Sequence, residues 1–477
     1  MPSSSIPAPR RIPTVRVHLA ASLAIALPIL ALSLSAQDFS HPDTQPAPGT
    51  ALIQKANDAL AAGDLAAALK ILTDLNTQTP NNAQVLYDLG LTLEALESSP
   101  ANNLQPPAPN QPTAEACYRQ SIDANPAFAA PHVALGLLLA RRGHPAEAHT
   151  QLTTATTLPD IEPALKAHAL RALARLDLGS PGQRSPQPNP AAASTDLLAA
   201  LNLTAEQPED ILLSAEIAEA AADFPAAERA YRRYLAIPAN ANDSRATAAL
   251  AHILLAEHHP ADAEALLIPA LARSPGDPSF TAQLAQAYLA SGDDAKIPQA
   301  AQLLEKLHAD RPNDANITRL LARVYLESGH PDQAEPIYAA LIAAQAAHPD
   351  PTLLDNRAEA LIRLHRPGEA EKLLKQAIAD PAAFPSPSAL ADAATHLAFA
   401  ASEIDDPRST LQALAIRATV QPPSPSSLYL EATANDDLHQ TAKAVELYKQ
   451  FLAAAGGTLP DQESQVRQRL AALAHTK

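Results

Sequence analysis

The sequence predicts an all-α protein built as a solenoid of antiparallel helix pairs, and three observations support this fold class. In residues 315–342, apolar residues recur three and four positions apart on both sides of a Gly-His-Pro turn, which indicates two short helices. The alanine in the second helix recurs at intervals of 36, 37, 34 and 36 residues, at Ala227, Ala263, Ala300, Ala334 and Ala370. Aromatic residues make up only 3% of the chain, so packing depends on Ala and Leu, which suits helices better than strands.

Residues 1–36 have the organisation of a secretory signal peptide. Arginines form a basic start, residues 19–34 form an apolar run with one proline inside it, and small residues lead to Ala36. We therefore expect an exported bacterial protein that is periplasmic or secreted. The alternative is an N-terminal anchor at residues 19–34 that tethers the protein to the inner membrane, although this run is short for a membrane span.

The rest of the chain divides by composition into a lead-in, a repeat region and a final helix. Residues 37–48 are a polar, Pro-rich lead-in, and about eleven repeats follow in residues 49–455. Pro-rich insertions are expected near residues 97–112 and 179–193. In the repeat that holds the second insertion, helices are expected from about 162 to 178 and around 197–203. Residues 459–477 predict one more helix with a single apolar face, which is what a capping helix of a solenoid needs.

The repeat pattern resembles that of the tetratricopeptide repeat family. That family has small or large apolar residues at positions 4, 7, 8 and 11 of the first helix and 20, 24 and 27 of the second helix. In the eighth repeat the matching residues are Leu321, Ala322, Tyr325, Ala334, Tyr338 and Leu341. The resemblance implies a right-handed superhelix whose concave groove binds a protein or peptide partner.

The resemblance also implies which side chains line the groove. In the family, positions 2, 5, 6, 9, 12 and 13 of the first helix face it. Carried over to repeats seven to nine, these positions include Gln283, Gln286, Arg319, Arg323, Asn356 and Arg363. Arg319 and Arg323 are four residues apart on one helix face, so they form a basic spot suited to a carboxylate or an acidic peptide. The alternative interpretation is that both arginines pair with nearby acidic residues.

Composition and motifs argue against several other functions. The net charge is −17, and becomes −20 without residues 1–36, so the surface repels nucleic acid. A single cysteine, Cys117, excludes an internal disulfide. No nucleotide-binding, hydrolase or metalloprotease motif is present, so we expect no enzyme activity, no cofactor and no metal site. Histidines such as those of the His258-His259 doublet are assigned to the turns between helices.

Together these observations predict an exported scaffold for protein–protein interaction in the cell envelope. Its groove is expected to bind a peptide or a partner helix. The alternative function is that of a non-catalytic accessory subunit in an envelope complex for polymer processing or secretion. The oligomeric state and the identity of the partner do not follow from the sequence.

Overall fold

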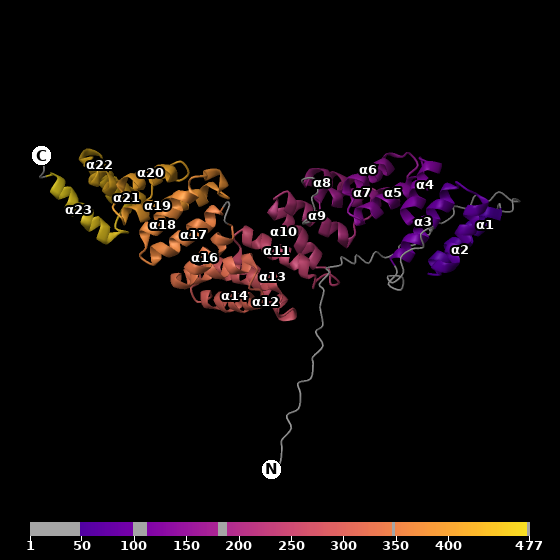
Figure 1. The fold of residues 1–477 in the computed structure, drawn as a ribbon, viewed down its shortest axis with the longest axis horizontal. Helices are drawn as coiled ribbons and strands as arrows, with labels where there is room; N and C mark the ends of the chain where they lie inside the picture. Colours follow the sequence, from indigo (N-terminus) through magenta and orange to yellow (C-terminus); the bar gives the residue numbers. More distant parts are fainter. Residues whose placement is uncertain (1–47, 99–111, 180–187, 346–348, 475–477) are drawn as a thin grey trace, which may run out of the picture. The chain divides into compact units, whose positions relative to one another are not determined.

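The computed structural model describes residues 48–98, 112–179, 188–345 and 349–474. Within these ranges the chain forms 23 α-helices, one short 3-10 helix and no strand (Figure 1). The predicted all-α fold class is therefore confirmed. The chain divides into two compact units, residues 1–169 and 170–477, with the boundary inside helix α7.

Unit 1 is a stack of helix pairs in which each helix from α1 to α5 contacts the helix that follows it. The first helices of neighbouring pairs also touch, because α3 contacts both α1 and α5. These first helices therefore form one side of the stack. The bounds are α1 (Pro48–Ala61), α2 (Leu65–Gln78), α3 (Ala83–Glu97), α4 (Ala114–Ala124), α5 (Ala129–Arg141), α6 (Pro145–Thr157) and α7 (Pro163–Leu178), which ends in unit 2.

Unit 2 repeats this arrangement (Figure 1). Its helices are α8 (Pro190–Leu201), α9 (Pro208–Ala220), α10 (Phe224–Leu235), α11 (Ser244–Ala256), α12 (Pro260–Arg273), α13 (Pro278–Ala290), α14 (Ile297–Asp310), α15 (Ala315–Glu327), α16 (Pro331–Ala344), α17 (Pro351–Arg363), α18 (Pro367–Ala377), α19 (Pro387–Ser402), α20 (Pro407–Ala418), α21 (Pro425–Asp437), α22 (Thr441–Ala455) and α23 (Pro460–Ala474). First helices are again neighbours, since α13 contacts both α11 and α15. The groove-lining positions of adjacent repeats thus lie on adjoining helices.

Helix starts and turns follow from local sequence. Asp314 precedes α15, and its carboxylate accepts hydrogen bonds from two backbone N–H groups of the first helical turn. Proline occupies the first turn of many later helices, where no backbone donor is lost. The turns within five pairs contain a residue with positive φ, between 56° and 79°, two positions before that proline: Gly143, His258, Gly329, His365 and Asp405.

Small residues at the helix crossings explain the close packing of each pair. Eight alanines at these crossings are fully buried: Ala251, Ala263, Ala285, Ala300, Ala322, Ala334, Ala358 and Ala370. Glycine takes this role at two crossings in unit 1. A Cβ on Gly90 would lie 2.5 Å from a ring carbon of Tyr118, and one on Gly136 would lie 2.6 Å from Cγ of Leu152. A larger side chain would force the helices apart.

One predicted boundary requires correction. Helix α8 begins at Pro190, whereas the insertion was predicted to extend to 193 and the second helix to lie around 197–203. Asn189 accepts a hydrogen bond from the backbone N–H of Ala192 and caps this helix, so the Pro-rich composition concealed a normal helix start. Residues 99–111 and 180–187 of the two insertions lie outside the described residues.

The predicted signal peptide, the alternative anchor at 19–34 and residues 37–47 of the lead-in also lie outside the described residues. Among the helices that the structure does describe, none has the length and apolar character needed to cross a membrane.

Candidate functional site

A pocket of about 390 Å³ opens on the first-helix side of repeats seven and eight. Helix α13 contributes Gln286, Leu289 and Ala290, and helix α15 contributes Arg323 and Glu327. These residues are three and four positions apart on their helices, so each set faces the same way. The turn after α13 and the start of α14 complete the wall with Gly292, Asp294 and Ile297. We call this the groove pocket.

The groove pocket combines apolar and polar walls. Leu289 and Ile297 are largely buried and supply apolar surface, whereas Gln286 is half-buried and forms no hydrogen bond with any described residue. A glutamine amide offers both donors and an acceptor, which is what a peptide main chain requires of its binding site. The arrangement suits an extended polypeptide with an apolar side chain.

Two of the predicted residues, Gln286 and Arg323, line the groove pocket. Arg323 pairs with Glu327, at 2.6 Å between Nη2 and Oε1, and its Nη1 donates to Oδ1 of Asn356 at 3.4 Å. Arg323 therefore links α15 to α17, and Asn356 is the third predicted residue brought to this place. Because its charge is already balanced by Glu327, Arg323 is less suited to capture a carboxylate than the sequence suggested.

The other three predicted residues differ in their surroundings. Arg319 is exposed on α15 and forms no ion pair with a described residue. Arg363 is held by Glu359 and by the carbonyl of Leu326, to which its Nη1 donates at 2.7 Å. Gln283 lies on α13 and donates to the carbonyl of Ala248 on α11 at 3.0 Å. Arg363 and Gln283 thus connect neighbouring first helices, and Arg319 is the one member of the predicted set with an unpaired charge.

Sequence reasoning missed several residues on this side of unit 2. Leu289 and Glu327 stand at positions 12 and 13 of their first helices, so the family pattern contained the signal that would have found them. It also missed a pair between α17 and α19, where Nδ1 of His396 lies 2.7 Å from Oδ1 of Asp355. Burial lowers the pKa of His396, but the hydrogen bond and charge of Asp355 outweigh this and raise it overall.

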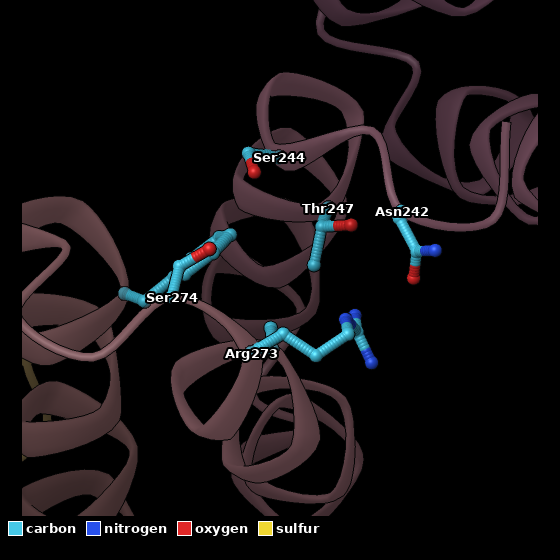
Figure 2. Close-up of a pocket in the computed structure, with 7 residues that line it drawn as sticks. Asn242, Ser244, Thr247, Arg273 and Ser274 are labelled. Atoms are coloured by element: carbon cyan, nitrogen blue, oxygen red, sulfur yellow. The ribbon is translucent and has the colours of Figure 1, made fainter.

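A second pocket, of about 180 Å³, lies at the junction of repeats six and seven. It is lined by the start of α11, the end of α12 and Phe280 of α13. Figure 2 shows the side chain of Arg273 extending from the end of α12 toward Asn242. The pocket is small and its walls are mainly short polar side chains, so the groove pocket is the better candidate for a polypeptide.

Comparison with known families gives a match in the part of unit 2 just described. Residues 294–354, which include α14, α15 and α16, match the family model described as Tetratricopeptide repeat. These residues therefore have the pattern of tetratricopeptide repeats. A tetratricopeptide repeat array is in general a non-catalytic scaffold for protein–protein interaction, and its relatives bind protein or peptide partners.

Solved structures similar to this chain have low identity to it. The tetratricopeptide repeat domain of P58(IPK) has 15% identity and a TM-score of 0.35, covering 90% of this chain and 100% of that one. The Cut9–Hcn1 hetero-tetramer of APC/C has 13% identity and a TM-score of 0.42, with 90% of each chain covered. PilF of Pseudomonas aeruginosa has 17% identity and a TM-score of 0.38, covering 49% of this chain and 94% of that one. No curated protein matches the sequence. Similarities at this level do not indicate the partner.

Proposed function

We propose that this protein is an exported scaffold of the cell envelope that binds an extended peptide, or a helix of a partner protein, in the groove pocket. The observation that supports this most directly is the shared wall of the pocket: two adjacent first helices each contribute residues from groove-lining positions. A ligand there would contact two repeats at once, so its affinity would come from several modest contacts.

The chemistry of the pocket favours recognition of main chain and apolar side chains over recognition of a terminal carboxylate. Gln286 has unused donors and an acceptor, and Leu289 and Ile297 supply apolar surface. Arg323 is paired with Glu327, and Asp294 adds a second carboxylate to the rim. The lining therefore contains two acids and one arginine. Arg319, on the same helix as Arg323, is the cation that could add an electrostatic contact with a ligand in the groove pocket.

Export is the second part of the proposal, and its support is the sequence of residues 1–36. The basic start, the apolar run at 19–34 and the small residues up to Ala36 are the three parts of a secretory signal. If this segment is cleaved, the protein recovered from the envelope should begin near Gln37, which N-terminal sequencing measures. Recovery of an intact N-terminus from the cytoplasm would contradict the export proposal without affecting the binding proposal.

The binding proposal is tested by site-specific photo-crosslinking and by capture from envelope extract. A photoreactive residue at Gln286 should crosslink a defined partner, whereas one at Arg273 should not, because Arg273 lines the other pocket. In the capture experiment, Arg319→Glu combined with Arg323→Glu should reduce retention of the same partner. Arg273→Glu is the control, since it reverses one charge at an exposed arginine of unit 2 outside the groove pocket. Equal retention by both variants and crosslinking from Arg273 alone would refute groove binding.

A further inference from the structure

Three potential metal ligands converge at the junction of repeats five and six. Glu228 lies on α10, Glu257 directly follows α11, and His259 directly precedes α12. Their ligand atoms, two carboxylate oxygens and one imidazole nitrogen, all lie within 4.8 Å of one another. The packing of α10 against α11 brings Glu228 to residues 29 and 31 positions later in the chain.

The turn between α11 and α12 explains why two of these ligands share one place. His258 has a φ of 61°, in the left-handed region, so the chain reverses tightly between Glu257 and His259. The imidazole of His259 does not cap α12, and the backbone carbonyl of His259 instead accepts from the N–H of Ala263. The ring nitrogens are therefore not committed to the helix and are available to a ligand.

The electrostatics of the cluster leave negative charge unbalanced. The carboxylate of Glu228 is 22% exposed, and its Oε1 accepts from Nε of Arg232 at 2.6 Å. Oε2 of Glu257 is shielded from solvent and has no hydrogen-bond partner among the described residues. Asp262 adds a third carboxylate, 3.8 Å from Nη2 of the same arginine. Arg232 thus pairs with two of the three acids, and a buried carboxylate oxygen without a partner, such as Oε2 of Glu257, is costly.

We propose that Glu228, Glu257 and His259 form a binding site for a divalent transition-metal ion, with Zn²⁺ as the best-suited ion. Two carboxylates and one imidazole are a ligand set that Zn²⁺ accepts, whereas Mg²⁺ and Ca²⁺ prefer oxygen ligands alone. Coordination would require these three ligand atoms, which lie within 4.8 Å of one another, to converge on one ion. Three protein ligands leave a fourth position for water or for a group from a partner. This goes beyond the proposed peptide binding, and it departs from the sequence prediction of no metal site.

The proposed metal would add a bridge between two repeats that are already joined by helix packing and by the Arg232–Asp262 and Arg245–Glu216 ion pairs. Glu228 belongs to the fifth repeat, and Glu257 and His259 belong to the sixth. Because the bound ion requires the folded arrangement of all three, metal binding should stabilise this junction in proportion to its affinity.

The chain supplies its own matched controls. His144 and His330 occupy the same place as His259, directly before the first proline of α6 and α16. In the described residues, neither belongs to a group of three metal-ligating side chains. A general contribution of exposed histidines to metal binding would therefore appear equally in His144→Ala and His330→Ala, whereas a specific site would not.

The experiment is zinc titration of the full chain, purified without an affinity tag and treated with chelator, by calorimetry and by competition with a chromogenic zinc chelator. We expect one equivalent of Zn²⁺ in the wild type and at least tenfold weaker binding in Glu257→Gln and in His259→Ala. His144→Ala and His330→Ala should bind as the wild type does. Zn²⁺ should raise the melting temperature of the wild type and of both controls, but not of the ligand variants, and circular dichroism checks that all variants fold. Absence of a stoichiometric site in the wild type, or equal binding by ligand variants and controls, would overturn the proposal.

Discussion

Four repeats have a tyrosine at the same position of the second helix, but the hydrogen bonding of the hydroxyl group differs among them. This difference gives a quantitative prediction. Each tyrosine stands four residues after the crossing alanine of its second helix or, in α4, after Ala114. In three of them the hydroxyl donates to a carboxylate: Tyr118 to Glu94 at 2.6 Å, Tyr231 to Glu219 at 2.6 Å, and Tyr448 to Asp436 at 3.2 Å. The hydroxyl of the fourth, Tyr338, is buried and has no partner among the described residues.

The sequence explains why Tyr338 lacks a partner. Glu219 stands 12 residues before Tyr231, and Asp436 stands 12 residues before Tyr448. The residue 12 positions before Tyr338 is Leu326, which is fully buried and has no hydrogen-bonding side chain. The hydroxyl of Tyr338 has therefore lost its hydrogen bonds to water without a replacement.

Removing this hydroxyl should have opposite effects at the two kinds of site. An unsatisfied buried polar group costs about 1–3 kcal/mol, so Tyr338→Phe should raise the free energy of unfolding by about 1 kcal/mol. A hydrogen bond to a charged group contributes about 1.5–3 kcal/mol, and Glu219 is partly solvated, so Tyr231→Phe should lower the free energy of unfolding by about 1–2 kcal/mol. The two substitutions delete the same atom, so the expected difference between them is about 2–3 kcal/mol.

The assay must report on single repeats, because helix pairs in a solenoid can open separately. We would measure amide hydrogen exchange of α15–α16 and of α9–α10 by mass spectrometry, together with urea unfolding followed by circular dichroism. Protection should increase in α15–α16 of Tyr338→Phe and decrease in α9–α10 of Tyr231→Phe. A loss of more than about 1 kcal/mol in Tyr338→Phe would show that its hydroxyl has a partner and would refute the reasoning.

Three further predictions concern unit 1. Burial raises the pKa of Asp88 to about 6, so the folded protein binds a proton at this carboxyl more tightly than the unfolded chain does. The stabilisation that this proton contributes is present below about pH 4 and is lost as the pH rises through about 6. Asp88→Asn should remove this pH dependence from urea unfolding between pH 4 and 7, and identical pH profiles would contradict the assignment. Gly90→Ala should destabilise by about 1–3 kcal/mol through the clash with Tyr118, whereas Gly368→Ala, which meets nothing within 4 Å, should be neutral or slightly stabilising in the same measurement. Burial raises the pKa of Cys117 to about 11, so Ellman's reagent should label it only after unfolding, and fast labelling of the native protein would count against its burial.

The sequence predicts the fold well because the fold depends on a few local rules. Small residues at helix crossings, prolines at helix starts and glycines in turns act within one repeat, and their recurrence is visible in one sequence. The crossing alanines from Ala227 to Ala370 are an example, since their spacing indicated the helix pairs and each of them is fully buried. The start of α8 was missed because a Pro-rich insertion and a Pro-led helix have the same local composition.

The site was predicted less completely because it depends on contacts between repeats. The pattern identified the positions of Gln286 and Arg323, and pairing of the arginines with nearby acids was its alternative interpretation, but it contained nothing about the contact of Arg323 with Asn356 in the next repeat. The approach of Glu228 to His259 has the same origin, since it arises from the packing of α10 on α11. Contacts of this kind depend on rotamers and helix offsets, which composition and spacing do not determine.

The buried crossing alanines also bear on how such a chain can diverge. Each crossing requires a small residue on each of its two helices. Most other positions of a repeat require only an apolar residue on the buried face or a polar residue on the exposed face. Sequences can therefore drift far apart while every crossing survives, and the signal that a homology search detects fades before the architecture changes. The family model matches only residues 294–354, whereas the helix pairs extend from α1 onward, so the architecture covers more of the chain than the recognisable family pattern does. For a chain of this kind, the spacing of small residues therefore indicates the architecture even where the residues between them do not.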